Sequence, residues 1–97
     1  MRLSEEERNI IKSTLYQSLG KNMDIYLFGS RVDDSRKGGD IDLFVKAGKL
    51  ISLKDKLKVL TLLEMRGIER KVDLIIENPQ NVNSPVVKEA MSKGILL

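Results

Sequence analysis

The sequence has 97 residues, with 17 Lys and Arg against 14 Asp and Glu, which gives a net charge of +3. A chain of this length buries roughly 60 to 68% of the surface that its unfolded form exposes, so we expect a single domain over residues 1–97 with one modest core. The chain contains no cysteine and no histidine. Disulfides, zinc ribbons, thiol nucleophiles and imidazole bases are therefore excluded, and chemistry based on oxygen ligands remains.

Composition also narrows the class of protein. An apolar content of 41% is too high for a disordered tail, and no apolar run approaches the roughly 18 residues of a membrane span. Residues 1–7 are acidic and lack the apolar centre of a signal peptide, so we expect a cytoplasmic protein. The basic residues are scattered and only two Tyr and two Phe could stack on bases, which disfavours direct nucleic-acid binding.

The first half of the chain predicts a helix and two strands. Ser4 and Glu7 form a capping-box pattern, and apolar residues then recur at helical spacing until Gly20, which predicts a helix over residues 5–19. Residues 23–28 predict a buried strand that closes on a tight turn, and the polar residues 31–39 predict a loop. Residues 40–45 predict a second strand that enters the core from a solvated edge.

The second half predicts helix, strand, helix and a short tail. Ser52 predicts the start of a helix that ends at Gly67, and residues 71–76 predict a third strand. Ser84 and Pro85 predict the start of a last short helix, and residues 95–97 are expected to form a fourth strand or a docking tail. The residues of the first of these helices that are expected to pack into the core are Leu53, Leu57, Leu60 and Leu63. The apolar residues of the last helix are Val86, Val87, Ala90 and Met91. The order of elements predicts a small α+β (α/β) fold, with helices packed against a mixed sheet of three to four strands.

Three acids lie inside apolar strand patterns, where Asp is normally depleted. Asp40 and Asp42 share one face of their predicted strand about 7 Å apart, and Asp73 joins them if its strand lies alongside. Clustered carboxylates repel one another unless a cation neutralises them, and oxygen ligands favour Mg²⁺ or Mn²⁺.

Each acid also has a structural interpretation. Asp40 can cap its strand, Asp42 can face solvent on an edge strand, and Asp73 can pair with Lys71 or Arg70. For any single residue, the two interpretations have similar weight.

A further motif joins the acids. Gly29 and Ser30 end the first predicted strand, where backbone N–H groups and a hydroxyl can approach phosphate oxygens, with Arg31 beside them as a charged donor. Residues 27–31, 39–43 and 72–74 (LFGSR, GDIDL and VDL) resemble the minimal nucleotidyltransferases (MNT proteins) of the DNA polymerase β-like superfamily, and the resemblance covers essentially the whole chain.

The resemblance implies the polymerase β-like palm fold and a role for each motif residue. Gly29 and Ser30 would hold a nucleoside triphosphate, with Arg31 assisting at the phosphates. The expected catalytic residues, which would also ligate two Mg²⁺ ions, are Asp40, Asp42 and Asp73. Asp73 would in addition help to deprotonate the attacking hydroxyl.

One spacing departs from the family. Family members commonly have ten residues between the Ser and the first Asp, whereas residues 31–39 here are nine. The tandem glycines 38 and 39 can absorb the shorter loop, with some weakening of activity as the expected cost.

Among stand-alone members, chains this short resemble the antitoxins of toxin–antitoxin pairs whose toxin is a helical HEPN ribonuclease. The resemblance implies a Mg²⁺-dependent enzyme that transfers AMP from ATP to a hydroxyl of the HEPN partner, expected to be a tyrosine. The alternative is a catalytically weak binding module that neutralises the ribonuclease by forming a complex with it. A transferase for small hydroxylated compounds is disfavoured, because 97 residues leave no room for the added acceptor domain of those enzymes.

Overall fold

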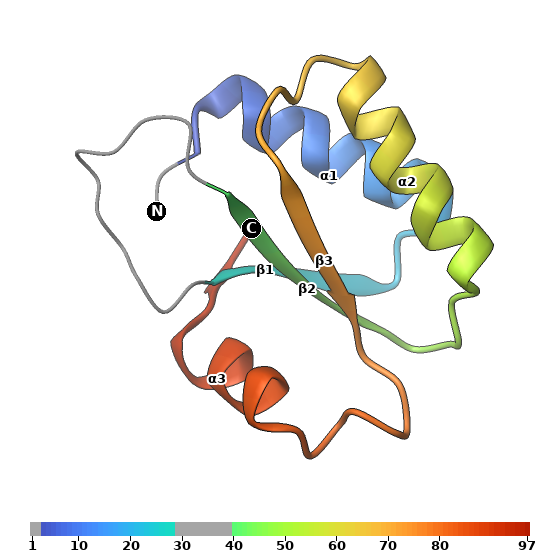
Figure 1. The fold of residues 1–97 in the computed structure, drawn as a ribbon, viewed down its shortest axis with the longest axis vertical. Coiled ribbons are helices and arrows are strands. Elements are labelled where there is room, and N and C mark those ends of the chain that lie inside the picture. Colours follow the sequence, from blue (N-terminus) through green and yellow to red (C-terminus); the bar gives the residue numbers. More distant parts are fainter. Residues whose placement is uncertain (1–2, 29–39) are drawn as a thin grey trace.

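A four-stranded mixed sheet organises the part of the chain that the computed structural model describes, residues 3–28 and 40–97 (Figure 1). The strands lie in the order β3-β2-β1-β4, with β2 parallel to β3 and β1 antiparallel to both of its neighbours. The elements in chain order are α1 (Glu5–Leu19), β1 (Met23–Phe28), β2 (Ile41–Ala47), α2 (Leu53–Met65), β3 (Val72–Ile76), α3 (Pro85–Lys93) and β4 (Ile95–Leu96). The predicted α+β fold, with helices against a mixed sheet, is confirmed.

The helices begin where the sequence predicts. In the capping box of α1, the Glu7 N–H donates to Ser4 Oγ at 3.0 Å and the Ser4 N–H donates to Glu7 Oε1 at 3.0 Å. Ser52 and Ser84 cap α2 and α3 through their hydroxyls. None of the helices within residues 3–28 and 40–97 is long and apolar enough to cross a membrane.

Strand ends differ from the expectation by one or two residues. The second strand begins at Ile41 rather than Asp40 and continues to Ala47, and the third begins at Val72 rather than Lys71. Of the two outcomes left open for the C-terminal segment, the strand is the one that forms, because β4 pairs with β1.

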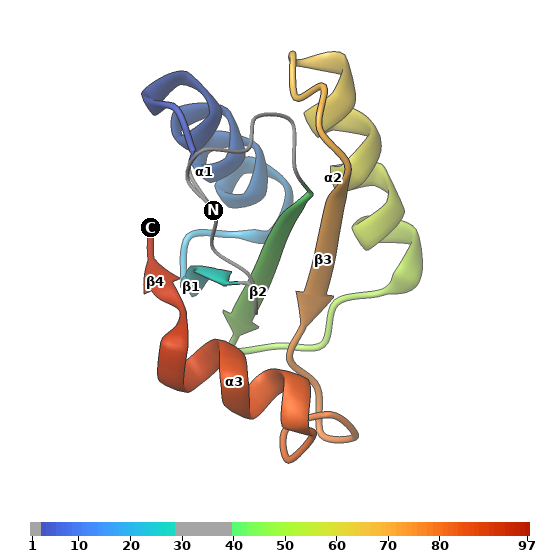
Figure 2. The same cartoon turned by 60° about the vertical axis from the view of Figure 1, so that its left-hand side comes forward.

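Each face of the sheet packs against its own layer of helix. Figure 2 shows α1 and α2 on one face and α3 on the other. The first face holds the larger core, to which α1 contributes Ile11, Leu15 and Leu19. On the second face, the fully buried Phe44 packs with Val87 and Ala90 of α3. Because successive strand residues point to opposite faces, β2 supplies both cores.

The expected apolar row of α2 is partly wrong. Leu53 and Leu57 are 68% and 53% exposed, and the residues that α2 buries are Val59 and Leu63. Leu60 is half-buried. A helix this rich in apolar residues carries two rows at i, i+4 spacing, and only packing against the sheet and α1 decides which one turns inward.

The apolar set of the last helix is also only partly buried. Val87 and Ala90 lie in the core, whereas Val86 and Met91 are 44% and 39% exposed. The short α3 covers the sheet with a single narrow row.

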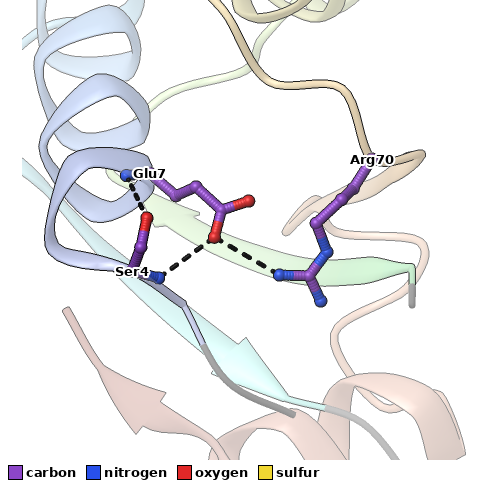
Figure 3. A network of polar contacts seen from close by, with 3 residues as sticks. All are labelled: Ser4, Glu7 and Arg70. Carbon is purple, nitrogen blue, oxygen red and sulfur yellow. Dashed lines mark hydrogen bonds and ion pairs between the residues drawn. The ribbon is translucent and has the colours of Figure 1, made fainter. Parts of the chain in front are cut away.

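One polar network ties α1 to the start of β3 (Figure 3). Glu7 Oε1, which caps the helix, also lies 3.4 Å from Nη1 of Arg70. Arg70 is two residues before β3, and the next residue, Lys71, accepts a hydrogen bond from the Ile41 N–H through its carbonyl at 2.8 Å. The network therefore helps to fix the end of the sheet at which β2 and β3 begin.

The capping box makes a testable contribution to stability. Ser4→Ala removes the side-chain acceptor of the Glu7 N–H and should lower the free energy of unfolding by about 1 kcal/mol. Urea denaturation followed by circular dichroism measures this difference. The matched control is Ser18→Ala, at an exposed position in the last turn of the same helix. Equal stability of the two variants would contradict the prediction.

Candidate active site

The parallel pairing of β2 with β3 brings two of the predicted acids together. Asp42 and Asp73 are register partners, so their side chains leave the sheet on the same face, the one that α3 covers. Asp42 is half-buried and lies on β2, which has a strand on each side. The interpretation of Asp42 as an edge-strand residue facing solvent is therefore wrong.

The three acids influence one another electrostatically. Burial is the main factor that raises the pKa of the Asp42 carboxyl, followed by the negative charge of Asp73, a side-chain hydrogen bond with Asp73 and the charge of Asp40. Asp40 lies one residue before β2 and is exposed. All three predicted acids thus interact at this end of the sheet, with Asp42 at the centre.

The structural interpretation of Asp73 holds in part. Lys71 Nζ lies 4.0 Å from Asp73 Oδ1, and both side chains are about half exposed or more. An exposed ion pair of this length contributes little to stability. The pair is compatible with a role of Asp73 at the site.

The donor set fits a hard divalent cation. Within residues 3–28 and 40–97, no three carboxylates are close enough together to form a ready-made metal site. The register places the carboxylates of Asp42 and Asp73 on neighbouring strands, and Asp40 adds its charge. Two carboxylates that disfavour each other's ionised form gain most from a cation between them, and oxygen ligands of this type suit Mg²⁺.

The residues predicted to bind phosphate lie outside the described part of the chain. Gly29, Ser30 and Arg31 follow Phe28 in the sequence, and Phe28 is the last residue of β1. Phe28 is the register partner of Asp42 on the side of β2 opposite Asp73. The phosphate-binding motif therefore begins, in the sequence, directly after Phe28, the residue that pairs with Asp42.

A pocket of about 520 Å³ adjoins the carboxylate pair. It extends from Phe28 past Asp42 and Asp73 and is bordered by Lys56 of α2 and Glu89 of α3, both half-buried. Neither Lys56 nor Glu89 stands out in the sequence. Both lie on helices among other charged residues, and no spacing motif links either of them to the acids.

The acid pair should cost stability in the metal-free protein. The raised pKa of Asp42 means that the folded state disfavours the carboxylate at neutral pH, and this cost is relieved as the pH falls through the raised pKa towards the ordinary value of 3.8. Asp42→Asn should therefore raise the midpoint of thermal unfolding at pH 7 in EDTA by a few degrees. The advantage should vanish below the ordinary pKa of Asp.

Bound Mg²⁺ should relieve the cost of the acid pair to the stability of the folded protein. Mg²⁺ should stabilise the wild type, because a ligand that binds only the folded state raises its stability, and it should leave Asp42→Asn unchanged. The control is Asp24→Asn, on the same face of the sheet at the far, exposed end of β1. If Asp24→Asn raises the midpoint of thermal unfolding in EDTA as much as Asp42→Asn does, the pairing of Asp42 with Asp73 is not the cause of the increase.

Comparisons with known proteins agree on the family. The family model described as polymerase beta, nucleotidyltransferase matches residues 5–97. No curated protein matches the sequence significantly.

Solved structures with the same fold come from toxin–antitoxin complexes. A structure of the MntA-HpeT toxin–antitoxin pair is 25% identical with a TM-score of 0.68, over 93% of this chain and 69% of that chain. A complex of the tri-AMPylated Shewanella oneidensis HEPN toxin with the MNT antitoxin is also 25% identical, with a TM-score of 0.67, over 94% of this chain and 67% of that chain. A second MntA-HpeT structure, 22% identical with a TM-score of 0.70 over 93% of this chain and 70% of that chain, shows the same fold.

The resemblance noted in the sequence is thus confirmed at the level of the family and the fold. The match spans the helices and strands described above, including the strands that carry Asp42 and Asp73. The chain belongs to the polymerase beta nucleotidyltransferase family.

Proposed function

We propose that this chain is a Mg²⁺-dependent nucleotidyltransferase that transfers AMP from ATP to a tyrosine hydroxyl of a HEPN toxin and so acts as its antitoxin. The observation that carries the proposal is the pairing of Asp42 with Asp73 beside a pocket, in a chain of this family. The similarity to an MNT antitoxin bound to a tri-AMPylated HEPN toxin supports both the type of transfer and the type of partner.

The carboxylates have the principal roles in this proposal. Asp40, Asp42 and Asp73 hold the metal, and Asp73 also accepts the proton of the attacking hydroxyl. When bound, two Mg²⁺ ions supply charge that lowers the pKa of the acceptor hydroxyl and stabilises the departing pyrophosphate. Gly29, Ser30 and Arg31 bind the triphosphate, and Phe28 ends the strand that leads to them.

These roles need only residue types that the chain contains. Phosphoryl transfer of this kind depends on positioning and on charge, so it needs neither a histidine base nor a cysteine nucleophile. The packed sheet supplies the positioning, because Leu43, Phe44 and Val45 are fully buried directly after Asp42. A buried strand allows Asp42 little backbone movement.

The test combines the purified chain with the HEPN partner, ATP and Mg²⁺. Intact-mass spectrometry of the partner should show the addition of AMP, which EDTA abolishes and excess Mg²⁺ restores. Asp42→Asn combined with Asp73→Asn should lower the transfer rate at least about a hundredfold, because both oxygen ligands become neutral amides. Asp24→Asn, on the same sheet face outside the site, should transfer at the wild-type rate.

A binding measurement separates the enzyme from the alternative binding module. Calorimetry should show that the double variant still binds the partner, because the two substitutions preserve shape and only remove charge. If the wild type binds the partner and inhibits its ribonuclease activity without any transfer of AMP, the chain acts by complex formation and the proposed enzymatic function is wrong.

A further inference from the structure

The pocket beside the carboxylate pair lies towards one particular side of the sheet. Among the described strands, β3 is at the edge, and the pocket reaches that edge through Asp73 and Ile75. Helices border it on both sides, with Lys56 and Leu60 from α2 and with Val86 and Glu89 from α3. The pocket therefore lies on the β3 side of Asp42, whereas β1 and β4 lie on the other side.

If the proposed function is correct, the geometry of the transfer places the acceptor on the β3 side of Asp42. The residues that bind the triphosphate follow β1, which adjoins Asp42 on one side, and Asp73 adjoins Asp42 on the other. In an in-line displacement, the attacking oxygen approaches the phosphorus from the side opposite the leaving pyrophosphate. The acceptor must then approach from the side of β3, which is where the pocket lies.

The lining indicates the chemistry of the acceptor. In the proposed function Asp42 and Asp73 hold the metal, so Glu89 and Lys56 are the charged lining residues that remain, and their charges cancel. The pocket therefore lacks the excess of positive charge that recognises an acceptor with phosphates, such as the end of an RNA strand, and suits a neutral hydroxyl. Leu60, Ile75 and Val86 supply apolar surface for an aromatic ring.

The size of the pocket agrees with a single side chain. Its volume of about 520 Å³ lies within the usual range of sites for small ligands, which is enough for one aromatic side chain. We propose that this pocket binds the tyrosine side chain of the acceptor protein, with Val86 and Glu89 of α3 as residues that determine specificity. We name it the acceptor pocket; its assignment rests on the proposed function.

The chemical step is balanced by groups already named. The phenol oxygen forms a bond to the α-phosphorus of ATP, and the bond from that phosphorus to the bridging oxygen breaks. Pyrophosphate leaves with the bonding electron pair, and the phenol proton passes to the Asp73 carboxylate. Asp73 lies in the wall of the acceptor pocket, so the hydroxyl reaches its proton acceptor without further movement of the chain.

Filling the acceptor pocket should separate acceptor binding from nucleotide binding. Val86→Trp places a large side chain at a position that is 44% exposed, so the core need not expand. Transfer of AMP to the partner should fall roughly tenfold or more through a higher KM for the acceptor. The Kd for ATP with Mg²⁺, measured by calorimetry, should stay at the wild-type value.

The matched control is Met91→Trp. Met91 is 39% exposed on the same helix and does not line the acceptor pocket. This variant should transfer AMP as the wild type does, and thermal melting should show that both variants are folded. If Val86→Trp also transfers at the wild-type rate, the acceptor does not use this pocket.

A binding measurement tests the acceptor pocket without relying on catalysis. In methyl NMR spectra recorded with Mg²⁺ and a non-hydrolysable ATP analogue, titration with N-acetyl-tyrosine amide should shift the signals of Val86 and Ile75. The signals of Val82 and Met91, outside the pocket, should not move. Shifts confined to other residues, no shifts at all, or equal shifts with a short oligoribonucleotide would overturn the assignment.

The two experiments distinguish the inference from the proposed function. If the wild type transfers no AMP but tyrosine amide still shifts Val86 and Ile75, the proposed enzymatic function fails and the pocket remains a tyrosine site. If AMP is transferred and neither Val86→Trp nor the NMR titration shows an effect at the pocket, the function stands and the acceptor pocket is wrong.

Discussion

The parallel pairing of β2 with β3 is the interaction on which the rest of the site depends. Its register sets Asp42 on β2 opposite Asp73 on β3. Parallel strands need a crossover connection, and here α2 supplies it. The crossover helix also contributes Lys56 and Leu60 to the pocket, so one topological unit builds both the acid pair and one of its walls.

The sheet tolerates the acid pair because the rest of β2 is deeply buried. Burial of the Asp42 carboxyl, and after it the negative charge of Asp73, raise the pKa of Asp42, and this shift is the sign of a cost to the folded state. Leu43 and Val45 offset it by packing into the larger core, and Phe44 packs against α3. The strand thus combines a polar start that is electrostatically unfavourable with a buried apolar remainder, so a rigid fold holds the carboxylate where a cation can relieve that cost.

Helix α3 has two roles on the face that carries the acids. Val87 and Ala90 cover Phe44 and complete the second core. Val86 and Glu89, on an adjoining side of the same helix, line the pocket instead. A short helix whose apolar row is narrow can cover the middle of the sheet and still leave the acid end accessible to a partner.

Much of the local structure was predictable from the sequence, because it depends on neighbouring residues. The capping pattern of Ser4 and Glu7 fixes the start of α1, and the spaced motifs around Asp42 and Asp73 indicate the family. The tertiary structure decided what depends on residues distant in the chain. Sheet order and register placed Asp73 beside Asp42, packing turned Val59 and Leu63 of α2 inward in place of Leu53 and Leu57, and helix placement brought Lys56 and Glu89 to the pocket. Propensity and periodicity act over a few residues, whereas strand partners and buried faces are chosen by the packing of the whole chain.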